Sequence, residues 1–221
     1  MNKTKLIIWD FNGTLVDDTW LFVEIINILL EKNGLKKISI TDYQSVFCFP
    51  IKKYYELLGF DFKRTDFDSL SHEFIKLYNK RKYSASLYSG AFSLLEKLSA
   101  RKVDMCLLSA QEHSSLVDLS KYYNIHSCFK FVQGTDNINA EGKSILAKKI
   151  ISSFNYEPEE LLFIGDTNMD VDIALENNSN VIILTCGHQA SYRFTSSPCV
   201  FKINSFDRLG PCLRAKFLGC L

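Results

Sequence analysis

The sequence predicts an α/β fold with a Rossmann-like parallel sheet core, helices on both faces and an inserted all-helical cap domain. Three observations lead to this prediction. Residues 6–9 are apolar without polar alternation, as in a strand buried on both faces. Residues 17–86 contain only helical patterns, and from residue 87 onward apolar runs alternate with helical ones. We therefore expect an α/β core of residues 1–16 and 87–221, with a helical cap at 17–86.

The first helix of the expected cap covers residues 17–33, where apolar side chains recur at helical spacing. Asp17 and Asp18 lie at its start, where the helix dipole favours acidic side chains. Asn33-Gly34 is a helix stop signal. The sequence thus places a long amphipathic helix directly after the first strand.

Two further helical stretches follow in the expected cap. Residues 41–59 are interrupted at Phe49-Pro50, because proline breaks a helix interior but starts a new helix well. Residues 66–83 form the last long helical pattern. No strand is expected between residues 17 and 88.

The remaining chain is predicted to alternate helices and strands, joined by right-handed crossovers. Each strand is a short apolar run, and each helix carries apolar residues at intervals of three and four. The predicted strands span residues 103–108, 128–132, 161–164, 181–184 and 200–203. The predicted helices span residues 90–98, 116–123, 144–154 and 170–177.

Composition limits the classes of function. The chain has 221 residues and a formal net charge of +1, so no charged field indicates a nucleic-acid or membrane partner. The longest apolar region, residues 21–30, is interrupted by Glu24 and Asn27, and the N-terminal apolar run is too short for a signal peptide. Seven scattered cysteines form no CxxC pair, which favours free thiols in a reducing compartment. We expect a cytoplasmic monomer or homodimer without covalent linkage through Cys220.

Two stretches place aspartates at the ends of predicted strands. Asp10 follows the first strand and precedes the turn residues Asn12-Gly13. Asp166 ends a later strand, and Asp170 lies one helical turn further along. Because open α/β sheets bind ligands at the carboxyl ends of their strands, three carboxylates could meet there. Such a cluster would need a cation, and its hard oxygen atoms suit Mg²⁺, whereas the alternative is two unrelated helix caps.

Asp10-Phe11-Asn12-Gly13-Thr14 and Gly165-Asp166-Thr167-Asn168-Met169-Asp170 resemble the motifs of the haloacid dehalogenase-like hydrolase superfamily, in particular its phosphoglycolate phosphatase-like branch with a helical cap. The resemblance implies a Mg²⁺-dependent phosphatase that forms an aspartyl-phosphate on Asp10 and acts on a small phosphorylated substrate. It implies metal ligation by Asp10, Asp166 and the backbone carbonyl of Asn12, and by Asp170 either directly or through a water molecule. Haloacid dehalogenation fits less well, because that branch needs no metal and this chain keeps both later aspartates.

The resemblance also implies which residues hold the phosphate. Ser109 ends a predicted strand at the position whose hydroxyl binds a phosphate oxygen together with the neighbouring amide, here of Ala110. An ordinary helix N-cap is the alternative for Ser109. Lys143 opens a helix and matches by position the lysine that neutralises nucleophile and phosphate, although the Pro-x-Pro that often follows is absent. By the same resemblance Thr14 orients the loop and contacts the phosphate.

Two other lysines compete with Lys143 for this role. Lys148 and Lys149 lie inside the same predicted helix, where we expect them to face solvent. The resemblance therefore favours Lys143.

Asn12 departs from the usual family pattern, Asp-x-Asp-Gly-Thr. In the family the second aspartate protonates the leaving alcohol and then activates water, and general acid–base help is worth about 10²–10⁴-fold. One explanation is that another group supplies the proton, with Glu112, His113, Asp17 and Asp18 as candidates. A second is a substrate with a good leaving group, such as an acyl phosphate or a phosphonate. A third is a catalytically weak or silent protein that binds a phosphorylated ligand, and a fourth is an Asn introduced to trap a complex.

Basic and aromatic residues cluster around Pro50 in the expected cap, which should determine specificity. Lys52 and Lys53 could meet an anionic substrate such as a carboxylate, or they could form a solvated helix face. The aromatic members of the cluster are Phe47, Phe49, Tyr54 and Tyr55.

Overall fold

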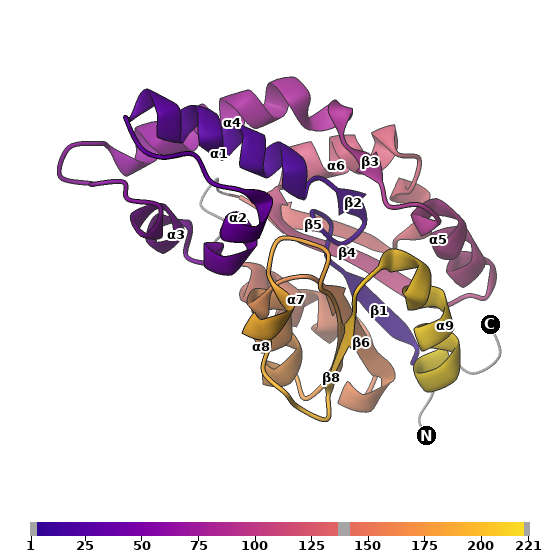
Figure 1. The fold of residues 1–221 in the computed structure, drawn as a ribbon. Helices are drawn as coiled ribbons and strands as arrows, with labels where there is room; N and C mark the ends of the chain where they lie inside the picture. Colours follow the sequence, from indigo (N-terminus) through magenta and orange to yellow (C-terminus); the bar gives the residue numbers. More distant parts are fainter. Residues whose placement is uncertain (1–3, 137–141, 219–221) are drawn as a thin grey trace.

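A six-stranded parallel sheet forms the centre of the molecule (Figure 1). The computed structural model describes residues 4–136 and 142–218. The strand order is β5-β4-β1-β6-β7-β8, with β1 between β4 and β6. The strands are β1 (Leu6–Trp9), β4 (Asp104–Glu112), β5 (Phe131–Thr135), β6 (Leu161–Gly165), β7 (Asn180–Leu184) and β8 (Val200–Ile203). The predicted parallel α/β class is therefore confirmed.

Both faces of the sheet are covered, which explains why its strands are apolar without alternation. Ile7 and Trp9 of β1 belong to the core cluster with α5 (Ala91–Ala100), α6 (His113–Tyr122) and α9 (Leu209–Leu213). Leu6 and Ile8 face the opposite side, in the cluster with α7 (Lys143–Ser152) and α8 (Asn168–Glu176). Successive residues of one strand thus anchor helices on opposite faces.

Four helices lie between β1 and the rest of the sheet in the sequence, and we call residues 19–81 the helical insert. They are α1 (Thr19–Lys32), α2 (Ile40–Val46), α3 (Ile51–Leu57) and α4 (Phe67–Arg81). In Figure 1 they lie together beyond one end of the sheet. The insert has its own buried cluster, which includes Ile26, Tyr43 and Tyr54. The boundaries of a cap at residues 17 and 86 stay a prediction.

The prediction of no strand between residues 17 and 88 is wrong. β2 (Val16–Asp17) pairs antiparallel with β3 (Ser86–Leu87). The two short strands lie where the chain passes from the six-stranded sheet into the helical insert and where it returns. Strands of two residues carry no readable periodicity, so only the meeting of these distant segments reveals them. Asp17 consequently belongs to a strand, and α1 begins at Thr19.

Other differences concern strand ends and the C-terminal region. β4 runs past the predicted end at residue 108 to Glu112, and its pairing with β5 is irregular there. β5 begins at Phe131, because His126–Cys128 forms a short 3₁₀ helix instead of a strand. α9 and the π-helical turn Arg214–Leu218 were not predicted, since elements of five residues show little periodicity. The other predicted elements are observed close to their predicted bounds.

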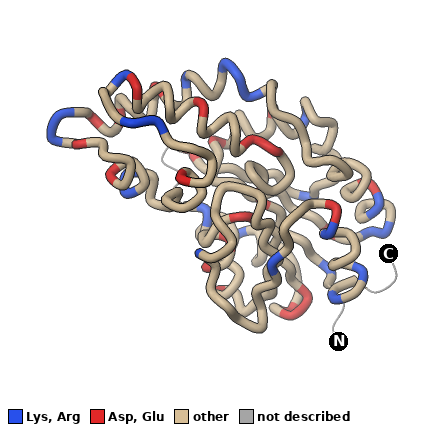
Figure 2. The backbone as a smooth tube through the Cα atoms, viewed as in Figure 1, with Lys and Arg blue, Asp and Glu red and all other residues tan. Residues whose placement is uncertain are grey.

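The surface carries charges of both signs. In the view of Figure 2, Lys and Arg lie among Asp and Glu on both the helical insert and the sheet domain. Across residues 4–136 and 142–218, no helix is long and apolar enough to cross a membrane. The six cysteines within the described part are free thiols, and Cys220 lies outside it. Cytoplasmic location and oligomeric state stay predictions.

Candidate active site

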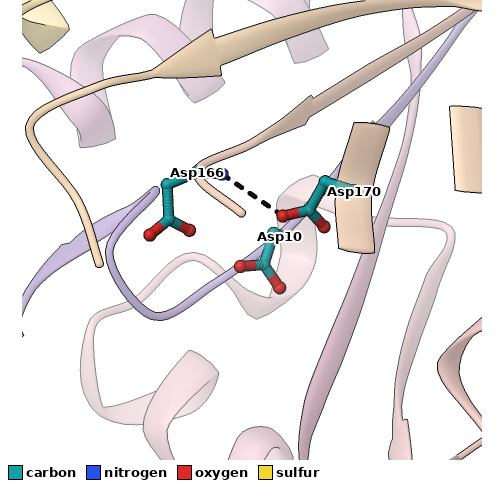
Figure 3. Close-up of side chains that lie close together, drawn as sticks. All are labelled: Asp10, Asp166 and Asp170. Carbon is teal, nitrogen blue, oxygen red and sulfur yellow. Dashed lines mark hydrogen bonds between the residues drawn. The ribbon is translucent and has the colours of Figure 1, made fainter. Parts of the chain in front are cut away.

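Three carboxylates meet at the carboxyl ends of β1 and β6 (Figure 3). Asp10 follows β1, Asp166 follows β6 and Asp170 lies in the first turn of α8. One oxygen of each lies within 4.8 Å of the other two. Trp9 pairs with Ile164 in the parallel ladder, and the Asp10 amide donates to the Ile164 carbonyl at 2.8 Å. This register brings together residues that are far apart in the sequence.

Lys143 lies among the carboxylates. Its Nζ donates to Asp10 Oδ1 and to Asp170 Oδ1, both at 2.6 Å, and its side chain is buried. The first residue of α7 is therefore the lysine that the fold directs inward. The two lysines that compete with Lys143 face solvent, as predicted. Lys148 Nζ lies 3.9 Å from Glu176 Oε2 and 62% of the Lys148 side chain is exposed, and Lys149 is also exposed.

Burial and neighbouring charges shift the pKa values of Asp10, Asp166 and Lys143. Burial is the main cause that raises the pKa of Asp10 well above its usual value, and Asp170 and Asp166 add to it although Lys143 opposes it. Burial also raises the pKa of Asp166 to about 6, against the opposing effect of His188. For Lys143, burial lowers the pKa, but Asp10 and Asp170 more than offset this and the net pKa is raised. Asp10 and Asp166 therefore hold their protons more strongly than free aspartates do, and a cation bound beside them would favour their ionised forms.

The loop after β1 is fitted tightly against the cluster. Gly13 has a φ of +69°, and a Cβ there would lie 2.3 Å from Asp166 Oδ2, so no other residue type fits without rearrangement. The Gly13 amide donates to Asp18 Oδ1 at 2.9 Å, and the Thr14 hydroxyl donates to Asp166 Oδ1 at 3.0 Å. Thr14 thus orients one carboxylate of the cluster.

Asn12 points its side chain towards the helical insert. Its Nδ2 donates to Asp18 Oδ2 at 2.5 Å and to the Tyr78 hydroxyl at 3.0 Å. Asp18 is fully buried at the N-cap position of α1, and its side chain makes no cap hydrogen bond to that helix. Asp18 instead fixes the loop that carries Asn12 and Gly13.

Three other side chains were candidates to replace the missing acid. Glu112 lines the cavity beside Asp10, but its carboxylate accepts from the amides of Ser114 and Ser115 as the N-cap of α6. Burial raises the pKa of Glu112, while these hydrogen bonds lower it more, so the net pKa is lowered. His113 accepts from the Gly134 amide at 3.3 Å, and neither His113 nor Asp17 lines the cavity.

Sequence reasoning missed His188, which follows the end of β7. Its Nε2 lies 3.3 Å from Asp18 Oδ1, its Nδ1 lies 2.8 Å from the Tyr43 hydroxyl, and its amide donates to Asp166 Oδ2 at 2.6 Å. Burial lowers the pKa of His188, but the contact of its Nε2 with the Asp18 carboxylate and the negative charges of Asp166, Asp18 and Asp10 raise it overall. The available signal was its place just beyond a third strand end on the same sheet edge.

A cavity of about 180 Å³ opens beside the acidic cluster, between the sheet edge and the helical insert. Asp10, Asn12, Ser109, Ala110 and Lys143 line its sheet side. Ser109 is 2% exposed, and its Oγ accepts from the Gln111 amide within β4, so it caps no helix. The insert side is mainly aromatic, and its aromatic residues are Phe22, Tyr43, Phe47, Phe49, Tyr54, Tyr55, Phe74 and Tyr78.

Lys52 and Lys53 do not face this cavity. Both are exposed, and Lys52 Nζ lies 5.5 Å from the centre of the Phe62 ring. Of the two alternatives for these lysines, the structure supports a solvated helix face.

The fold and the acidic cluster place the chain in a known class. A family model described as haloacid dehalogenase-like hydrolase matches residues 7–184, so the chain belongs to the haloacid dehalogenase-like hydrolase family. The chain is also 22% identical over 183 residues to a phosphoglycolate phosphatase of Synechococcus elongatus, covering 83% of this chain and 84% of that protein. The resemblance drawn from the two aspartate motifs is therefore confirmed.

Solved structures agree with the fold. A predicted phosphatase from Clostridium acetobutylicum superposes with a TM-score of 0.78 at 17% identity, covering 97% of this chain and 100% of the other. A predicted phosphoglycolate phosphatase from Haemophilus somnus gives a TM-score of 0.76 at 18% identity, covering 96% of this chain and 98% of the other. At these identities the likeness establishes the shared architecture of sheet and helices.

Proposed function

We propose that this hydrolase is a Mg²⁺-dependent phosphatase that cleaves a small phosphorylated metabolite through an aspartyl-phosphate on Asp10. The observation that carries the proposal is the buried cluster of Asp10, Asp166 and Asp170 around Lys143, open to a cavity. The similarity to a phosphoglycolate phosphatase supports the same reaction class.

The residues of the cluster fit a magnesium ion. Their donors are all oxygen atoms, which Mg²⁺ prefers, and three buried carboxylates face a single lysine ammonium. Asp10, Asp166, Asp170 and the backbone carbonyl of Asn12 would hold the ion. When bound, Mg²⁺ would neutralise charge between the phosphate and the carboxylates. The use of a backbone carbonyl means that Asn at position 12 need not harm the metal site.

Asp10 is suited to attack phosphorus. Lys143 bonds to its Oδ1, which opposes the rise in the pKa of Asp10 that burial causes, and leaves Oδ2 for the new bond. The Asp10–phosphorus bond forms as the bond from phosphorus to the leaving oxygen breaks. Ser109, the Ala110 amide and Lys143 would hold the other phosphate oxygens. Water then attacks phosphorus, which releases inorganic phosphate and restores the carboxylate.

Asn12 determines which substrates react quickly. An amide can neither protonate an alkoxide nor activate water, and Asp18 beside it is engaged by Asn12, Gly13 and His188. Esters with poor leaving groups should therefore turn over slowly. The alternative function, a catalytically weak or silent protein that binds a phosphorylated ligand, is favoured by this same residue.

Acetyl phosphate tests the proposal, because its acetate leaving group needs no proton from the protein. With Mg²⁺ the protein should release inorganic phosphate, and acid-quenched samples should carry one phosphoryl group by intact mass spectrometry. Asp10→Asn should abolish both signals, whereas Asp172→Asn, an exposed acid on α8, should keep them.

The result that would contradict the mechanism is phosphate release that survives the loss of Asp10. Tight binding of phosphate esters without any release at any pH would instead support the alternative of a silent binding protein.

A further inference from the structure

The cavity beside Asp10 has a mainly aromatic and aliphatic wall on the side of the helical insert. Its insert side is built from one face of α4, where Ser71, Phe74, Ile75 and Tyr78 recur at helical spacing, together with aromatic residues of α1 to α3. The leaving group of a phosphate ester bound at Asp10 would have to lie against this wall. The wall therefore determines which leaving groups are accepted.

No free cation faces that space among the described residues that line it. Lys143 is the one lysine or arginine of the described lining, and its Nζ is already shared between Asp10 and Asp170 at 2.6 Å. The remaining ionisable groups there include Glu112, which is an acid, and His188, which is paired with Asp18 and Tyr43. A carboxylate on the leaving group would lose its water without gaining a counter-ion, which is unfavourable.

Two hydroxyl groups in the lining have no partner. Tyr54 Oη and Ser71 Oγ are buried, line the cavity and make no hydrogen bond. Buried polar groups are nearly always satisfied, so a ligand that offers an uncharged donor or acceptor would complete them. The wall thus suits a mainly apolar group with a small polar substituent.

We propose that the substrate is a phosphomonoester of an uncharged, aromatic alcohol, with a leaving group of about one ring that carries a hydroxyl or carbonyl. The cavity of about 180 Å³ must hold the phosphate as well as the leaving group, and since an apolar cavity of about 150 Å³ holds one benzene ring, one ring is the upper limit for the leaving group. The proposal rests on the proposed phosphatase function. It excludes phosphoglycolate and sugar phosphates as preferred substrates.

Benzyl phosphate and phosphoglycolate form a matched pair for the test, because both release a primary alkoxide and Asn12 penalises both equally. With Mg²⁺, we expect kcat/KM for benzyl phosphate to exceed that for phosphoglycolate by at least about 30-fold, from burial of the ring. A preference for phosphoglycolate, while acetyl phosphate is still hydrolysed, would overturn the substrate class and leave the phosphatase function intact.

A binding measurement keeps the test valid when turnover is absent. Phenylethylphosphonate and phosphonopropionate are the non-hydrolysable counterparts of the two esters, and calorimetry with Mg²⁺ gives their dissociation constants. We expect phenylethylphosphonate to bind at least about tenfold more tightly. If it does so while no ester is hydrolysed, the phosphatase function fails and the ligand class stands. Tighter binding of phosphonopropionate overturns the ligand class.

A variant with a new cation tests the cause. Ile75→Lys places an ammonium in the wall at a half-buried position, and it should lower the preference for benzyl phosphate over phosphoglycolate about tenfold. Ile40→Lys makes the same change at an exposed position of α2 outside the lining and should leave the preference unchanged. An equal change of this preference in both variants would show that the absence of a cation from the wall does not cause the preference for benzyl phosphate.

The unpartnered hydroxyls are tested separately. A benzyl phosphate with a ring hydroxymethyl group should have a higher kcat/KM than benzyl phosphate, and Tyr54→Phe should reduce that advantage severalfold. Retention of the full advantage in both Tyr54→Phe and Ser71→Ala would show that neither hydroxyl binds the substituent.

Discussion

Asn12 occupies the position from which the family's second aspartate acts, and its amide is engaged by Asp18 and Tyr78. An aspartate at this position would face the buried carboxylate of Asp18. Two like charges in a buried site raise the pKa of one of them, so the new carboxyl would keep its proton near neutral pH. The surroundings of Asn12 would therefore make an aspartate an effective general acid.

Asn12→Asp should raise kcat for benzyl phosphate by about 10²–10⁴-fold, since it supplies the missing proton transfer. The measurement is phosphate release at saturating substrate with Mg²⁺. Acetyl phosphate is the control for the first step, because its leaving group needs no proton and the rate at which it phosphorylates Asp10 should change little. An unchanged rate for benzyl phosphate would indicate that another group already supplies the proton.

Lys143 is a second residue whose surroundings predict the effect of a substitution. It is 4% exposed, and its ammonium is the shared partner of Asp10 and Asp170. Removing one partner of a buried ionic network leaves uncompensated charge. The lysine therefore matters for stability as well as for the phosphate binding that we propose for it.

Lys143→Met should lower the free energy of unfolding by about 3–5 kcal/mol in the presence of a chelator. Lys148→Met should change it by less than about 0.5 kcal/mol, because Lys148 is exposed. Urea denaturation at neutral pH compares the two variants. Equal stability of both would mean that protonation of the carboxylates compensates for the lost ammonium.

At the scale of elements, the loop after β7 ties the helical insert to the sheet. Gln189 is 1% exposed, accepts from the Asn168 amide at the start of α8 at 2.7 Å, and donates to the Phe47 carbonyl at the end of α2 at 2.8 Å. Gln44 of α2 donates back to the Gly187 carbonyl at 2.7 Å. These contacts hold α2 over the cavity beside Asp10.

Gln189→Ala should cost about 1–3 kcal/mol, because it leaves the Asn168 amide without its acceptor, whereas the Phe47 carbonyl still accepts from Arg193. The amides of α2 should exchange hydrogen faster, while those of β1 and β6 should remain protected. Gln133→Ala is the control, since within residues 4–136 and 142–218 the Gln133 side chain bonds only to the adjacent Gly134 carbonyl. Unchanged exchange in α2 would show that Gln189 does not hold the insert in place.

At the scale of the whole molecule, the acidic cluster joins segments that are distant in the sequence. Thr14 and Asp166, which share a hydrogen bond, are 152 positions apart in the chain. Burial raises the pKa of Asp166 to about 6, above its ordinary value of 3.8. Without metal, the folded protein therefore binds more protons than the unfolded chain between about pH 4 and 6, and its stability falls as the pH rises through this window. Metal binding requires the deprotonated carboxylates and has the opposite pH dependence.

The difference in melting temperature between samples with Mg²⁺ and samples with chelator should therefore widen as the pH rises from about 5 to about 7. Scanning calorimetry across this range gives the comparison. Asp166→Asn should remove the difference, whereas Asp172→Asn should retain it because Asp172 is exposed on α8. A constant difference at every pH would argue against ligation by these carboxylates.

The parallel sheet and most of its helices could be predicted because each leaves a local pattern. Leu6–Trp9 and Val200–Ile203 are found where their apolar runs placed them. The elements β2, β3 and α9 were missed because they are too short to show a periodic pattern of apolar residues. The start of β5 was predicted too early, because the apolar run around Cys128 begins with a 3₁₀ turn. Their structures depend on contacts with distant segments.

By itself the sequence determined the hydrolase family, the two aspartate motifs and the strand ends that carry Asp10 and Asp166, because these are properties of consecutive residues. Only the tertiary structure decided that Lys143 bridges Asp10 and Asp170, that His188 joins the site, and that aromatic side chains rather than Lys52 face the cavity. The physical reason is that such contacts depend on how helices and loops pack across the sheet edge, which no local pattern encodes.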